Sequence, residues 1–65
     1  MTNYQQAKEQ LKESAKWIKR ETPNDKPMIR MYINDMCGIY CNDYDLTDYQ
    51  RDLLSNYACK LHPKN

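Results

Sequence analysis

The chain has 65 residues, with ten Lys and Arg against nine Asp and Glu and a formal net charge of +1. So short a chain forms one domain and hides only about 60% of the surface that its unfolded form exposes. The near-neutral charge argues against strong whole-molecule attraction to nucleic acid or anionic lipid. No apolar run approaches the ~20 residues of a membrane span, and the polar start MTNYQQAKEQ lacks a signal-peptide pattern. We therefore expect a cytoplasmic protein.

The first predicted element is a helix over residues 3–21. Thr2 or Asn3 can cap its start, and a glutamine three residues after either one completes a capping box. Apolar side chains then recur close to every 3.6 residues, which places them on one face of the helix. The predicted buried face consists of Tyr4, Ala7, Leu11, Ala15 and Ile18.

Residues 22–27 contain an Asn and an Asp between two prolines, a composition typical of a turn. A second helix is predicted over residues 26–41, with Asp25 as its cap. Gly38 either lies inside this helix, at a cost of about 1 kcal/mol relative to alanine, or ends it. We expect the helix to continue to about Cys41. Its predicted inner stripe is Ile29, Tyr32, Ile33, Met36 and Tyr40, widened by Met28, Met31 and Ile39.

A second turn is predicted at residues 42–45, followed by a third helix over residues 47–62. Thr47 and Gln50 have the spacing of a capping box, and Pro63 closes the helix. Its apolar face is Leu53, Leu54, Tyr57, Ala58 and Leu61. The sequence therefore predicts an all-α fold, a small three-helix bundle, in which each apolar face is covered by the other two helices.

Three cysteines and one histidine have the residue types and spacing of a zinc site: Cys37, Cys41, Cys59 and His62. In an antiparallel hairpin, however, we expect Cys59 to lie about eight residues, or ~12 Å, beyond the level of Cys37. A zinc–sulfur bond is only ~2.3 Å long, so one ion cannot join these thiols. We therefore expect the cysteines to be reduced, small buried side chains, with no bound metal and no cofactor.

Two other patterns argue against chemistry on this chain. Cys59 and His62 could pair as nucleophile and base, but no third group is evident to orient the histidine. The acidic turn from Asp43 resembles the start of a calcium loop, yet Asp48 replaces its glycine and Leu54 its last carboxylate. We expect no catalytic residue.

A basic ridge on the first predicted helix is a candidate nucleic-acid contact. It consists of Lys8, Lys12, Lys16 and Lys19. Such a ridge beside Trp17 could contact a phosphate backbone. Glu9 and Glu13 interleave with it, however, and an ordinary solvated helix face is the competing interpretation.

Six tyrosines, four methionines and one tryptophan exceed what three short helices can bury. These side chains are enriched in protein interfaces because they combine large area with a polar or adaptable end. The expected partner-binding residues are Trp17, Met28, Met31, Tyr32, Tyr40, Tyr44 and Tyr49. The competing interpretation is that the tyrosines only rim the core.

The leading hypothesis is a non-enzymatic regulator or inhibitor that docks on a larger protein or on its own copy. Nucleic-acid binding is the first alternative and a zinc-stabilised domain the second.

Overall fold

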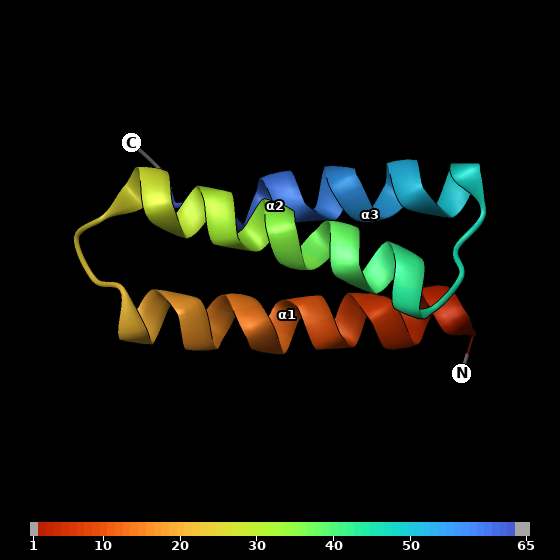
Figure 1. Cartoon of the computed structure of the whole chain (residues 1–65), viewed down its shortest axis with the longest axis horizontal. Helices are drawn as coiled ribbons and strands as arrows, with labels where there is room; N and C mark the ends of the chain where they lie inside the picture. Colours follow the sequence, from red (N-terminus) through yellow and green to blue (C-terminus); the bar gives the residue numbers. More distant parts are fainter. Residues whose placement is uncertain (1, 64–65) are drawn as a thin grey trace.

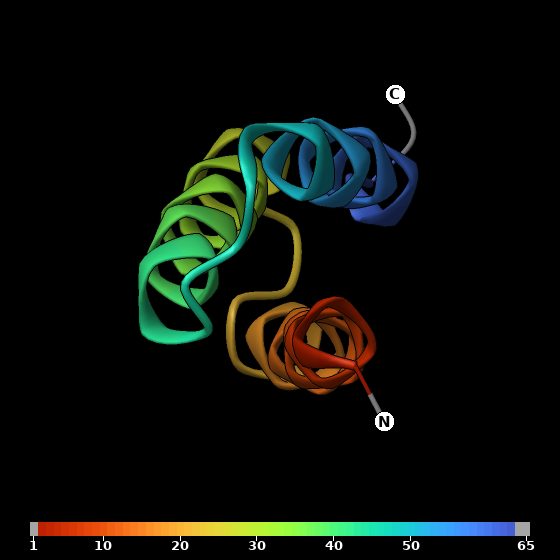
Figure 2. The ribbon, with the colours of Figure 1, turned by 90° about the vertical axis from the view of Figure 1, so that its right-hand side faces the viewer.

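The computed structural model describes residues 2–63. It contains three helices: α1 (Asn3–Glu21), α2 (Lys26–Asp43) and α3 (Asp48–Leu61). They run alternately in opposite directions, so that α1 and α3 are parallel and α2 is antiparallel to both (Figure 1). Seen along the bundle, the three helices occupy the corners of a triangle, and each contacts the other two (Figure 2). The predicted all-α three-helix fold is confirmed.

Side-chain caps explain where each helix begins. The Thr2 hydroxyl accepts the backbone N–H of Gln5 at 3.1 Å, and the Gln5 side chain accepts the backbone N–H of Thr2 at 3.1 Å. Thr47 and Gln50 make the same reciprocal pair, at 3.2 and 3.0 Å. The carboxylate of Asp25 accepts a backbone N–H three residues later. Each bond satisfies a donor that has no partner within its helix, which confirms the predicted caps at Thr2, Asp25 and Thr47.

The end of α2 is set by a backbone turn and not by Gly38, which lies inside the helix. Asp45 adopts a left-handed conformation with φ of 51°, and the Leu46 N–H donates to the Cys41 carbonyl at 3.0 Å. The Asp45 N–H donates to the Asn42 carbonyl at 3.2 Å. These two bonds form a Schellman motif, so α2 extends to Asp43, two residues beyond the predicted end.

The core is formed by one face of each helix together with Leu46 from the second turn. The predicted face of α1 is confirmed, since Ala7, Leu11, Ala15 and Ile18 are all buried. The rest of the buried cluster is Ile29, Ile33, Cys37, Cys41, Leu46, Leu54 and Ala58. Among residues 2–63, every buried side-chain nitrogen and oxygen atom has a hydrogen-bond partner.

The predicted inner stripe of α2 is partly wrong. Ile29 and Ile33 are buried as expected, but the helix turns its two cysteines inward beside them and leaves Tyr32 exposed. Met28, Met31 and Ile39, which were expected to widen the stripe, are exposed as well. Because α2 is apolar around most of its circumference, periodicity alone could not orient it. In the described part of the chain, no helix is both long and apolar enough to cross a membrane.

Candidate interaction surface

The largest gathering of exposed apolar side chains lies on α2 and on the neighbouring end of α1. Its members, called here the apolar surface, are Trp17, Met28, Met31, Tyr32 and Ile39, which are 55, 38, 49, 38 and 47% exposed. Residues 28, 32, 35 and 39 are spaced so that they share one face of a helix. This face points away from the core, because Ile33 and Cys37, on the opposite side of α2, are buried. The exposed residues therefore form a stripe along α2.

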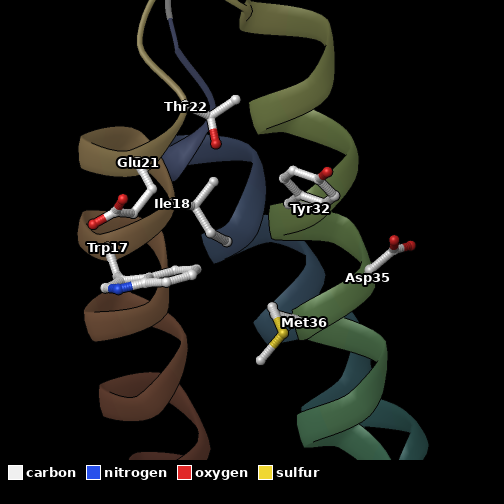
Figure 3. A pocket seen from close by; sticks show the side chains of 7 residues that line it. All are labelled: Trp17, Ile18, Glu21, Thr22, Tyr32, Asp35 and Met36. Carbon is white, nitrogen blue, oxygen red and sulfur yellow. The ribbon is translucent and has the colours of Figure 1, made fainter.

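A groove of about 470 Å³ separates this stripe from α1. It is lined by Trp17, Ile18, Glu21, Thr22, Tyr32, Asp35 and Met36. Figure 3 shows the Trp17 ring extending from α1 toward α2 and the Tyr32 ring lying against α2 on the other side of the groove. The buried Ile18 lies between the two helices, where it closes the inner side. The α1/α2 groove thus has aromatic walls and an apolar base.

The charge of the α1/α2 groove is negative. Glu21 and Asp35 are its only charged lining residues, and both are exposed. Their side chains lie along its two outer edges, Glu21 on α1 and Asp35 on α2 (Figure 3). Glu21 is also 4.0 Å from the Arg20 guanidinium, but both side chains are more than half exposed, so this pair is weak.

Two of the predicted partner-binding tyrosines, Tyr40 and Tyr44, also pack against the core. Tyr40 and Tyr44 are half-buried and pack against the buried cluster, with ring centroids 6.4 Å apart. The Tyr40 hydroxyl lies 2.6 Å from the Ser14 hydroxyl, in hydrogen-bond contact, and ties α2 to α1. Both side chains are therefore largely occupied within the bundle. Tyr49 is 71% exposed, but it lies in the first turn of α3 and does not line the groove.

A second hollow of about 380 Å³, called here the α2/α3 groove, brings the three cysteines together. Its lining is Asn34, Cys37, Gly38, Cys41, Arg51, Ser55, Ala58 and Cys59. Cys37 and Cys59 both line this hollow. His62 on α3 bonds to Asn34 on α2, and each of these residues lies three positions from one of the two cysteines, so Cys59 and Cys37 lie at similar levels along the antiparallel pair. The predicted offset of ~12 Å between these cysteines was wrong. Cys37 and Cys41 are buried as expected, whereas Cys59 is exposed.

One thiol of the α2/α3 groove, that of Cys37, is harder to ionise than an ordinary cysteine thiol. Burial raises the pKa of the Cys37 thiol, and the neighbouring Cys41 and Cys59 add to the rise. The His62 ring does not join the cysteines, because its Nε2 donates to the side-chain oxygen of Asn34 at 2.8 Å. Across residues 2–63, no three His, Cys, Asp or Glu side chains are grouped so that they could hold one metal ion.

The predicted basic ridge lies on the other flank of α1. Lys8 is half-buried, and its ammonium sits 4.8 Å from the ring centre of Tyr57 on α3. Lys12, Lys16 and Lys19 are exposed. Lys16 pairs with Glu13 at 3.6 Å, and both side chains are about two-thirds exposed. The ridge thus faces α3 and solvent, whereas Trp17 faces α2.

Six residues of the apolar surface and the α1/α2 groove were not among the predicted partner-binding residues: Ile18, Glu21, Thr22, Asp35, Met36 and Ile39. A sequence signal was available for Asp35 and Ile39. Asp35 has the spacing to share a helix face with Met28 and Ile39, and because a charged residue is rarely buried, its position predicts that this face is exposed. The pairing of this stripe with Trp17 and Glu21 depends on how α1 and α2 pack. Comparison of the chain with protein-family models, with curated proteins and with solved structures found no match.

Proposed function

We propose that the protein is a non-enzymatic interaction module, a regulator or inhibitor that docks its apolar surface on a larger protein. The observation that supports this most is the exposure of Trp17 and Tyr32 on facing walls of the α1/α2 groove. Met28, Met31 and Ile39 extend the same surface along α2. The docked face would block or bridge a site on the partner, with these side chains as anchors.

The physical argument is the cost of leaving this surface in water. Full burial of one fully exposed large apolar side chain is worth about 1.5–3 kcal/mol, and each of the five partly exposed residues gathered here would gain a fraction of that on docking. Tryptophan and tyrosine are the residues that most often dominate the binding energy of an interface. Large exposed patches of this kind mark interaction sites more often than singly scattered apolar residues do.

The test compares substitutions inside and outside the apolar surface. Trp17→Ala and Tyr32→Ala should leave the helical circular dichroism spectrum unchanged but weaken capture of a partner from the native cell at least tenfold. Tyr49→Ala removes an equally large exposed ring outside the groove and serves as the matched control. A protein retained by wild type and Tyr49→Ala but lost by the other two supports docking through the groove. Equal loss in all three variants, or no loss in any, contradicts it.

A second candidate function is contact with a nucleic-acid backbone through the basic ridge of Lys8, Lys12, Lys16 and Lys19. Its support is the helical spacing of these lysines along one flank of α1, where Lys8 contacts the half-buried Tyr57 of α3. The net charge of +1 makes this the weaker proposal. Binding to nonspecific duplex DNA should fall steeply with salt if these lysines neutralise phosphates. Lys8→Gln with Lys12→Gln should then reduce the salt dependence, whereas Trp17→Ala should not.

A further inference from the structure

The apolar lining and the charged edges of the α1/α2 groove indicate what kind of partner segment fits it. We infer that it binds a basic amphipathic helix of the partner protein, with an apolar side chain between Trp17 and Tyr32 and Arg or Lys side chains above the two edges. This inference rests on the proposed function. The observation behind it is that an apolar groove between two helices carries Glu21 on one edge and Asp35 on the other, and no basic lining residue.

The shape of the site favours a helix. The groove lies between two antiparallel helices that are already packed side by side (Figure 1). A further helix can lay its apolar stripe into such a groove, as ridges pack into grooves between helices. The apolar stripe of Met28, Tyr32 and Ile39 continues along α2 on both sides of Asp35, so several turns of the bound helix would be covered.

The charge of the site favours a basic partner. The carboxylates of Glu21 and Asp35 are both exposed, and they lie on opposite edges of the groove (Figure 3). A guanidinium or ammonium group above either edge gains an ion pair, and a guanidinium can also stack on the face of Trp17. A carboxylate on the bound helix would be repelled at both edges.

A second copy of this chain is a poorer occupant than a basic helix. In a twofold dimer the same surface patch meets itself, so contact through this groove would bring Glu21 and Asp35 toward their own counterparts. Two acids would then face two acids across an apolar interface, which costs free energy. The charge pattern therefore favours a partner of opposite sign over self-association.

The experiment is selection of binders from a random-peptide display library on the immobilised full-length protein. Enriched peptides should combine an apolar stripe at helical spacing with Arg or Lys flanking it. The fluorescence anisotropy of a dye attached to a selected synthetic peptide then measures its Kd for wild type and for every variant, including Trp17→Ala, which lacks the only tryptophan. Glu21→Gln with Asp35→Asn should weaken this binding about threefold to tenfold and reduce its salt dependence. Glu9→Gln with Asp52→Asn makes the same change in net charge on exposed acids outside the groove and should leave the Kd unchanged.

The outcomes separate this inference from the proposed function. Neutral or acidic peptides whose binding is lost in Trp17→Ala would overturn the basic occupant and leave groove docking intact. Peptides whose binding does not depend on Trp17, or the absence of any enriched peptide, would overturn both. An equal effect of the two charge-neutralising variants would show that net charge, and not the groove edges, selects basic peptides.

Discussion

The two hollows beside α2 have similar volumes, about 470 and 380 Å³, but opposite chemistry. In the α1/α2 groove, large rings from Trp17 and Tyr32 stand at the surface beside two acids. In the α2/α3 groove, the lining is mostly small, with Gly38, Ala58 and the cysteines. A groove bordered by small side chains offers little area to a partner, whereas one bordered by aromatic side chains offers a large contact surface.

The charged groups of the two grooves differ in the same way. Arg51, in the α2/α3 groove, donates from Nε to the Leu46 carbonyl at 3.1 Å and from Nη1 to the Asn42 side chain at 3.3 Å. Its donors therefore hold the second turn in place. The carboxylates of Glu21 and Asp35 lie at the surface of the α1/α2 groove. We infer that the α1/α2 groove faces a partner, whereas the α2/α3 groove is a packing seam of the bundle.

The largest effect is expected from Ile33→Ala, which should disrupt both grooves together. Ile33 is fully buried on α2, between Tyr32 in one groove and Asn34 in the other. Replacing a buried isoleucine by alanine costs about 2–5 kcal/mol, a large part of the stability of so small a domain. Urea unfolding followed by circular dichroism measures the loss. Ile39→Ala, at an exposed position on the same helix, should cost less than about 1 kcal/mol. Equal costs would mean that α2 is oriented differently.

Thiol reactivity should distinguish the inner and outer sides of the α2/α3 groove. Cys59 is exposed, whereas Cys37 and Cys41 are buried and burial raises the pKa of Cys37. Since the thiolate is the reactive form, we expect iodoacetamide to modify Cys59 at least tenfold faster than Cys37 near neutral pH. Mass spectrometry of time points identifies the site. In urea the three rates should converge, and convergence under native conditions would contradict the burial of Cys37.

Gly38→Ala should stabilise the protein by about 1 kcal/mol, because alanine favours the interior of a helix over glycine by that amount. A Cβ added at Gly38 would meet no atom within 4 Å, so the methyl group fits in the α2/α3 groove without strain. The urea midpoint should rise with no change in peptide binding to the α1/α2 groove. A loss of stability would mean that the space beside Gly38 is too small for a methyl group.

Sequence patterns predicted most of the fold because its signals are local. The capping boxes of Thr2 and Thr47 and the cap of Asp25 mark three helix starts to within one residue. The end of α2 escaped prediction, since Asp45 takes the left-handed position that glycine usually occupies. The candidate site was predicted only in part. Trp17 and Tyr32 were predicted to bind a partner because of their residue type. Their position across one groove depends on how α1 and α2 pack, which neither residue type nor spacing predicts.

The smallest expected effect concerns the outer end of the α2/α3 seam, where His62 donates to Asn34. Burial, and then the charges of Arg30 and Lys19, lower the pKa of His62 below that of an ordinary histidine. The unfolded chain therefore binds more protons than the folded chain as pH falls through the unfolded value of roughly 6.5. The contribution of His62 to the free energy of unfolding is present above that pH and is lost between it and the lower folded pKa. Its size is small, because the ring is only partly buried.

His62→Gln isolates this contribution, since glutamine retains an N–H donor for Asn34 but does not titrate. The stability of both proteins is measured by urea unfolding at pH 7.5 and pH 5. The carboxylates titrate equally in the two proteins, so their contribution cancels when the two losses of stability are compared. Wild type should lose more stability than His62→Gln over this interval, and by less than the gain from Gly38→Ala. Identical losses would place the His62 ring in water, away from Arg30 and Lys19, and would weaken the assignment of the α2/α3 groove as a packing seam that reaches the end of α3.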